Sequence, residues 1–145
     1  MMTTKPARMT TSNYWFDLEP VPASRPRIRT FKAKNGAMIS SAYYAGKYKK
    51  FMTEAETAIQ PAQFAHQGNL EVEVVCVVTK PKTTKRPNPN GDVDNYAKGV
   101  LDIITKKGYW EDDMQIVKLT VIKTWAGEGN VLDPGFSVEI TEVDY

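Results

Sequence analysis

Residues 70–79 constrain the fold of this 145-residue chain more than any other segment. Val72, Val74, Cys76 and Val78 recur at every second position, and Val75 and Val77 add apolar character between them. Because side chains alternate between the two faces of a strand, this pattern predicts a strand buried on both faces near its centre. Any fold of this chain therefore has to cover that strand on both sides.

The remaining pattern predicts an α+β fold in a single domain. Further strands are expected at 14–18, 115–125 and 136–143, helices at 41–59 and 95–107, and a short hairpin around Asn35-Gly36. The order β-α-β-α-β-β predicts one mixed sheet of about four strands packed with two main helices. Residues 1–13 are polar and aperiodic, which predicts a disordered tail and leaves residues 14–145 as the domain.

Several classes of protein are excluded by composition. A single cysteine, Cys76, excludes an intramolecular disulfide and a cysteine-built zinc site, and the single histidine, His66, disfavours a histidine-rich metal site. No apolar run approaches the ~20 residues that span a bilayer, and the N-terminal segment lacks the apolar stretch of a secretory signal. We therefore expect neither membrane association nor secretion.

Charge is segregated along the chain although the net charge is only +2. Residues 20–53 and 74–91 contain no acidic residue, yet they hold twelve of the nineteen basic residues, among them Arg25, Arg27, Arg29, Lys85 and Arg86. Such a distribution can present a basic face to a polyanion such as nucleic acid. The alternative, two solvated basic loops, stays open.

A second group of charged residues begins where the second basic stretch ends. Asp92 and Asp94 lie two residues apart where a loop enters the second helix, so both carboxylates can reach one hard cation such as Mg²⁺. Lys98 follows Asp94 by one helical turn and suits a phosphate or developing negative charge. The run Glu111-Asp112-Asp113 offers a third ligand.

These residues also have plain structural interpretations. Asp92 or Asp94 can be a helix N-cap, Asp94 and Lys98 an ordinary i,i+4 ion pair, and residues 111–113 a solvated loop. The helix carries the chain about 20 Å away from Asp94, and residues 108–113 retrace that distance only if nearly extended. Spacing therefore permits Asp113 near Asp92 without requiring it, and a shorter helix or a second subunit relaxes the constraint.

The order and spacing of these motifs resemble the RusA family of Holliday junction resolvases. That family shows D-x-D-N-x-x-K, a hydrophobic pair followed by Asp, an aromatic, D-D-x-Q-I/V and a strand lysine. The matching elements here are Asp92-Val93-Asp94-Asn95-Tyr96-Ala97-Lys98, Val100-Leu101-Asp102, Gly108-Tyr109-Trp110-Glu111-Asp112-Asp113-Met114-Gln115-Ile116 and Lys123, with Arg25-Pro26-Arg27 similar to an early Pro/Arg-rich motif. Where some members carry a basic run directly before the first Asp, this chain has residues 88–91 instead.

The resemblance implies a homodimeric, Mg²⁺-dependent endonuclease of a bacterial or phage-infected cytoplasm. It makes paired symmetric nicks at four-way DNA junctions in recombination and repair and uses no small-molecule cofactor. Asp92, Asp94 and Asp113 match the family's metal-binding aspartates, with Asp112 ranked behind Asp113, and Lys98 matches its catalytic lysine. Two alternatives stay open: a nuclease for other branched DNA such as forks and flaps, and a non-catalytic DNA-binding module.

Overall fold

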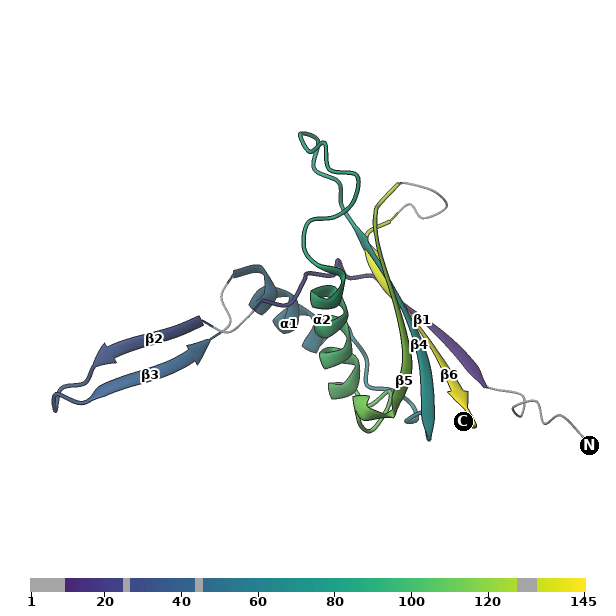
Figure 1. The fold of residues 1–145 in the computed structure, drawn as a ribbon, viewed down its shortest axis with the longest axis horizontal. Coiled ribbons are helices and arrows are strands. Elements are labelled where there is room, and N and C mark those ends of the chain that lie inside the picture. The colour runs from purple at the N-terminus through teal and green to yellow at the C-terminus, as the bar shows by residue number, and fades with distance from the viewer. Residues whose placement is uncertain (1–9, 25–26, 44–45, 128–132) are drawn as a thin grey trace, which may run out of the picture.

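The computed structural model describes residues 10–24, 27–43, 46–127 and 133–145. Its main sheet contains β1 (Thr11–Phe16), β4 (Asn69–Val78), β5 (Ile116–Trp125) and β6 (Gly135–Val143) in the order β1-β6-β4-β5. Helices α1 (Gly46–Ala58) and α2 (Val93–Lys106) lie on the same side of this sheet, and a 3₁₀ turn, η1 (Asp113–Gln115), leads into β5 (Figure 1). The α+β fold with four sheet strands and two helices is confirmed.

The main sheet is mixed, because β4 runs parallel to one neighbouring strand and antiparallel to the other. It pairs parallel to β5 and antiparallel to β6, and β6 pairs antiparallel to β1. Parallel neighbours need a crossover connection, and here α2 supplies it. Consequently the segment that joins β4 to α2 and ends with Asp92 leaves the carboxyl end of β4, and the segment that follows α2 returns to the amino end of β5.

The core lies between the helices and one face of the sheet. Its fully buried sheet residues are Leu70, Val74, Cys76, Phe136, Val138 and Ile140, and they pack against Phe51 and Ala55 of α1 and Val100, Ile103 and Ile104 of α2. The other face is polar, with Glu73 exposed and Glu71, Lys118, Thr120 and Glu139 lining one shallow hollow. Burial of β4 on both faces is therefore confirmed only toward its carboxyl end, where Val77 is fully buried.

A second, two-stranded sheet consists of β2 (Arg27–Lys32) and β3 (Met38–Tyr43). Its turn holds Asn35-Gly36, as predicted: Gly36 has φ +87°, and the Asn35 side-chain oxygen accepts a hydrogen bond from the amide of Ala37 (2.9 Å). Residues 41–43 were predicted to begin the first helix, and that prediction is wrong, because cross-strand pairing with β2 extends β3 to Tyr43 and α1 begins at Gly46.

At the amino end, β1 starts at Thr11 instead of Tyr14, since Thr11 pairs with Thr141 of β6. Residues 1–9 of the predicted tail lie outside the described residues. Among the helices that the structure describes, none has the length and apolarity needed to cross a membrane.

Candidate active site

Asp92 occupies the N-cap position of α2, but its carboxylate does not cap the helix. The residue is extended (φ −75°, ψ 144°), and no side-chain capping hydrogen bond is formed. Its backbone carbonyl instead accepts hydrogen bonds from the amides of Asn95 (3.0 Å) and Tyr96 (3.2 Å). The exposed carboxylate of Asp92 is therefore available for a role other than helix capping.

The three residues before Asp92 are held in place from outside the loop. Lys123 of β5 donates from Nζ to the carbonyl oxygens of Pro89 (2.8 Å) and Gly91 (2.6 Å), and the Tyr96 hydroxyl donates to that of Asn90 (2.9 Å). Gly91 has φ +100°, and a Cβ there would lie 2.8 Å from Cγ of Pro22. Glycine is thus required both by conformation and by space.

Asp94, Lys98 and Asp113 line one groove of about 480 Å³ between α2 and β5. Asp102 joins them, and the apolar part of the lining is Val93, Ala97, Leu101, Leu119 and Val121. Asp94, Lys98 and Asp102 succeed one another at helical spacing, so the groove follows α2 along its length. Asp92 is not among the lining residues.

Lys98 pairs with Asp102 and not with Asp94. Its Nζ lies 3.7 Å from Oδ2 of Asp102, and the Tyr48 hydroxyl donates to the same oxygen at 3.5 Å. Both partners of the ion pair are well exposed, so it contributes at most about 1 kcal/mol and breaks readily. Lys98 can therefore leave Asp102 for an anionic substrate at little cost.

The adjacent residues Asp112 and Asp113 have different surroundings. Asp112 is the N-cap of η1, and its carboxylate accepts from the amide of Met114 (2.8 Å) in a reciprocal capping box with Gln115. Asp113 is exposed and lines the groove. The carboxylate of Asp112 thus stabilises the turn, whereas that of Asp113 lines the groove.

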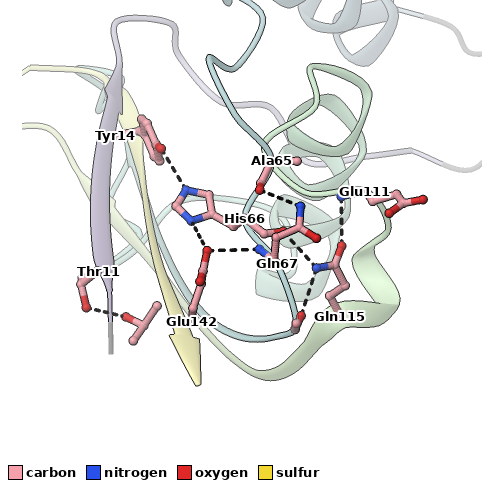
Figure 2. Close-up of polar contacts among 10 residues, drawn as sticks. Thr11, Tyr14, Ala65, His66, Gln67, Glu111, Gln115 and Glu142 are labelled. Carbon is pink, nitrogen blue, oxygen red and sulfur yellow. Dashed lines mark hydrogen bonds and ion pairs between the residues drawn. The ribbon is translucent and has the colours of Figure 1, made fainter. Parts of the chain in front are cut away.

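Gln115 connects this turn to the segment around His66 (Figure 2). Its side-chain oxygen accepts from the amides of Glu111 (2.9 Å) and Asp112 (3.0 Å), while its side-chain nitrogen donates to the carbonyls of His66 (3.1 Å) and Gly68 (3.0 Å). The amide side chain therefore fixes the position of the turn that carries Asp113.

His66 is fully buried rather than a surface loop residue. Its Nε2 lies 2.9 Å from the Tyr14 hydroxyl, and its Nδ1 lies 3.5 Å from Oε1 of Glu142 (Figure 2). Burial lowers the pKa of His66, and the nearby Glu142 carboxylate opposes that shift. The groove lining does not include His66, which fits a packing role.

Asp92 and Asp113 lie near opposite ends of β5. The loop before Asp92 is tied to Lys123, whereas Asp113 precedes Ile116, the first residue of that strand. Seven residues of strand separate these points, so the distance is on the order of 20 Å. Among the described residues, no three histidine, cysteine or carboxylate side chains lie close enough together to hold a metal ion.

The predicted DNA-contacting residues lie on two segments. Lys85 and Arg86 are exposed in the loop between β4 and α2, where Trp125 donates from Nε1 to the carbonyl of Arg86 (3.0 Å). Arg29 is exposed on β2, and Arg27 begins that strand. Arg25 lies outside the described residues.

Lys123 and Gln115 were identified from the sequence only as parts of a motif. Their hydrogen bonds to backbone groups were not predicted. For Lys123 a signal exists: Leu119, Val121 and Lys123 alternate on one face of β5, so a lysine interrupts the apolar, helix-facing side of a strand. A cation in that position needs acceptors, and the nearest are the carbonyls of the loop. No comparable signal marks Gln115 apart from its place three residues after Asp112.

Comparison with known proteins identifies a family for this chain. A family model described as endodeoxyribonuclease RusA matches residues 17–133. A search of curated proteins finds no matching relative. The matched segment includes β4, α2, η1 and β5 and every described residue of the groove. Since the match extends over most of the sequence, the chain belongs to the RusA family of endodeoxyribonucleases, and its substrate is DNA.

Proposed function

We propose that this endonuclease resolves Holliday junctions by paired, symmetric, Mg²⁺-dependent nicks, and so acts in recombination and repair. The observation that carries the proposal is the groove along α2, which combines Asp94 and Asp113 with Lys98. The carboxylate of Asp92 is exposed and forms no capping bond. Those features favour a nuclease over a DNA-binding module in which the aspartates only cap a helix.

The donor set fits Mg²⁺ in its chemistry, because Mg²⁺ prefers oxygen ligands and binds through one or two carboxylates while keeping several waters. Asp92, Asp94 and Asp113 are the residues that would hold it. When held there, Mg²⁺ would supply activation of a water and would offset charge on the scissile phosphate. Lys98, after leaving Asp102, would place its ammonium against the phosphate oxygens and stabilise the charge that develops there.

We further propose that two copies of the chain complete each site. One chain holds Asp92 and Asp113 on the order of 20 Å apart, near opposite ends of β5. A two-fold axis across the groove would set the α2 helices antiparallel and bring Asp113 of a second copy toward Asp92 of the first. Exposed Leu119, Val93 and Met114, with 41%, 40% and 85% of their surface accessible, would be covered in such a homodimer. Two symmetric nicks also require two sites.

Binding to DNA would rely on the basic segments. Lys85 and Arg86 lie on the loop that leads to Asp92, and Arg29 lies on β2. Contacts from lysine and arginine to phosphates release counterions, so affinity would fall steeply as salt rises. The substrate would thus be positioned by charge and cut at the groove.

The first test is incubation of the purified protein with a labelled four-way junction, in Mg²⁺ and in EDTA, beside Asp92→Asn and Asp94→Asn. We expect symmetric nicks in Mg²⁺ alone, and we expect both variants to bind the junction without cutting it. Forks, flaps and linear duplex run in parallel, since preferential cutting of forks or flaps would favour the broader branched-DNA nuclease. Binding without cleavage under every metal would refute the proposal and favour a binding module.

Mixing two inactive variants tests the shared site. A heterodimer of Asp92→Asn with Asp113→Asn keeps one intact site if each site takes Asp92 from one copy and Asp113 from the other. It has none if both residues come from the same copy. Nicking of a single strand by the mixture would support the shared site, and an inactive mixture that still forms heterodimers would refute it.

A further inference from the structure

The hairpin β2–β3 extends away from the helices and the main sheet (Figure 1). Its two strands pair with each other and with no strand of the main sheet. Phe31 and Ile39, which are cross-strand partners, expose 45% and 40% of their surface, and Ile28 and Met38 expose 74% and 66%. An isolated two-stranded hairpin is marginally stable in water, so a hairpin with this much exposed apolar surface gains stability from a partner.

The register assigns these residues to two different faces. Directly opposed residues share a face, so Phe31 and Ile39 lie together, with Arg29 two residues before Phe31 on the same side. Ile28 and Met38 belong to the opposite face, together with Thr30 and Ser40, whose hydroxyl oxygens are 3.3 Å apart. Phe31 therefore lies on the face of the hairpin that also carries Arg29.

Charge identifies the kind of partner. Residues 27–43 include Arg27, Arg29, Lys32 and Lys34 and contain no aspartate or glutamate. A second copy of the same hairpin would meet it with like charge, which is unfavourable across an interface. A polyanion with apolar base surfaces satisfies both features, because basic side chains contact phosphates while aromatic rings stack on bases.

We propose that β2–β3 is a DNA arm that enters the branch point of the substrate and stacks Phe31 on a base exposed there. Ile39 supports the ring from the neighbouring strand, while Arg29, on the same face as Phe31, holds a flanking phosphate. The inference rests on the proposed branched-DNA substrate and adds the surface that distinguishes a branch from a continuous duplex. In linear duplex every base is stacked on its neighbours, so Phe31 has no base face to contact.

The test compares Phe31→Ala with Met38→Ala, an apolar residue of the same hairpin on the opposite face. Binding to a four-way junction and to linear duplex of the same arm sequence is measured in EDTA, so that no cleavage occurs. Stacking on one base corresponds to about 5- to 150-fold in affinity. We expect Phe31→Ala to weaken junction binding by that factor and to leave duplex binding within twofold of the unchanged protein. Phe31→Trp and Met38→Ala should bind both DNAs with nearly the affinity of the unchanged protein.

A fluorescent 2-aminopurine at the branch point reports the contact directly. The unchanged protein and Phe31→Trp should quench it, and Phe31→Ala should not. Equal loss of junction and duplex affinity in Phe31→Ala, an equal effect of Met38→Ala, or a change of oligomeric state in Phe31→Ala would overturn the proposal, the last by identifying a second copy as the partner. If junctions are bound in this Phe31-dependent way but never cut, the arm stands and the proposed resolvase activity fails.

Discussion

Lys123 joins β5 to the loop before Asp92, and its loss should be felt in both stability and cleavage. Lys123→Met keeps an apolar stem of similar volume and removes the hydrogen bonds to the carbonyls of Pro89 (2.8 Å) and Gly91 (2.6 Å). Hydrogen bonds to charged groups contribute about 1.5–3 kcal/mol each, and one ammonium supplies both, so we expect a loss of about 2–3 kcal/mol. In a domain of this size that corresponds to about 4–12 °C in Tm.

Cleavage should fall because Asp92 directly follows the released loop. A displacement of a reacting group by 1 Å can cost about a hundredfold, so we expect a decrease of roughly 10- to 100-fold. The Mg²⁺ concentration for half-maximal cleavage should also rise, which a purely structural role of Lys123 would not produce. The two measurements are thermal melting followed by circular dichroism and junction cleavage titrated with Mg²⁺. Lys123→Arg should recover part of the lost Tm and part of the lost Mg²⁺ response.

Lys118→Met is the matched control. Lys118 is on the same strand but pairs with Glu71 at 3.7 Å on the polar face of the sheet, where its side chain is 65% exposed. An exposed pair of this kind contributes at most about 1 kcal/mol, so neither Tm nor cleavage should change much. If Lys123→Met lowers Tm and leaves the Mg²⁺ dependence equal to that of Lys118→Met, then Lys123 does not position Asp92.

Three other substitutions and conditions give separate checks. Gln115→Ala removes the capping box and should lower stability by about 1–2 kcal/mol and slow cleavage through Asp113; an unchanged urea midpoint and cleavage rate would contradict this. Burial lowers the pKa of His66 below its usual 6.5, so on acidification the unfolded chain is protonated at this residue before the folded protein is. The free energy of unfolding should therefore fall as pH drops below about 6.5, by up to about 1.4 kcal/mol per pH unit. Urea unfolding at successive pH values measures that slope, and His66→Gln should reduce it. Gly91→Ala should destabilise the loop, since its Cβ would meet Cγ of Pro22 at 2.8 Å, and a melting curve equal to the parent's would refute that steric argument.

Local pattern was enough to predict the main elements but not their neighbours. The valine-rich alternation of β4, the apolar stripe of α2 and the Asn35-Gly36 turn are each encoded within about ten residues, and all three are found. The insertion of β6 between β1 and β4 is not encoded that way, because it depends on pairing between residues more than fifty positions apart. The sequence also predicted residues 41–43, the last part of β3, as helix, since no local signal shows that a strand partner extends to Tyr43.

The candidate site was predictable in the same sense. Motif spacing identified the residues that now line the groove, Asp94, Lys98 and Asp113, but helix length left the distance from Asp92 to Asp113 open. The structure places these two near opposite ends of β5. The supporting contacts of Lys123 and Gln115 are to backbone carbonyls and amides, so residue pattern can indicate that Lys123 needs acceptors but does not identify which backbone groups either side chain contacts.

The position of β6 has a consequence for the order in which this protein can be assembled. Its residues come near the end of the sequence, yet β6 lies inside the main sheet and is the strand with which β1 pairs. During synthesis β1 is made first, but its pairing partner β6 is made last. The β1–β6 pairing therefore forms only at the end of synthesis. A chain interrupted before Gly135 would carry every aspartate of the groove and still lack the strand that joins β1 to β4. We therefore expect nuclease activity only from chains that have been translated at least through β6.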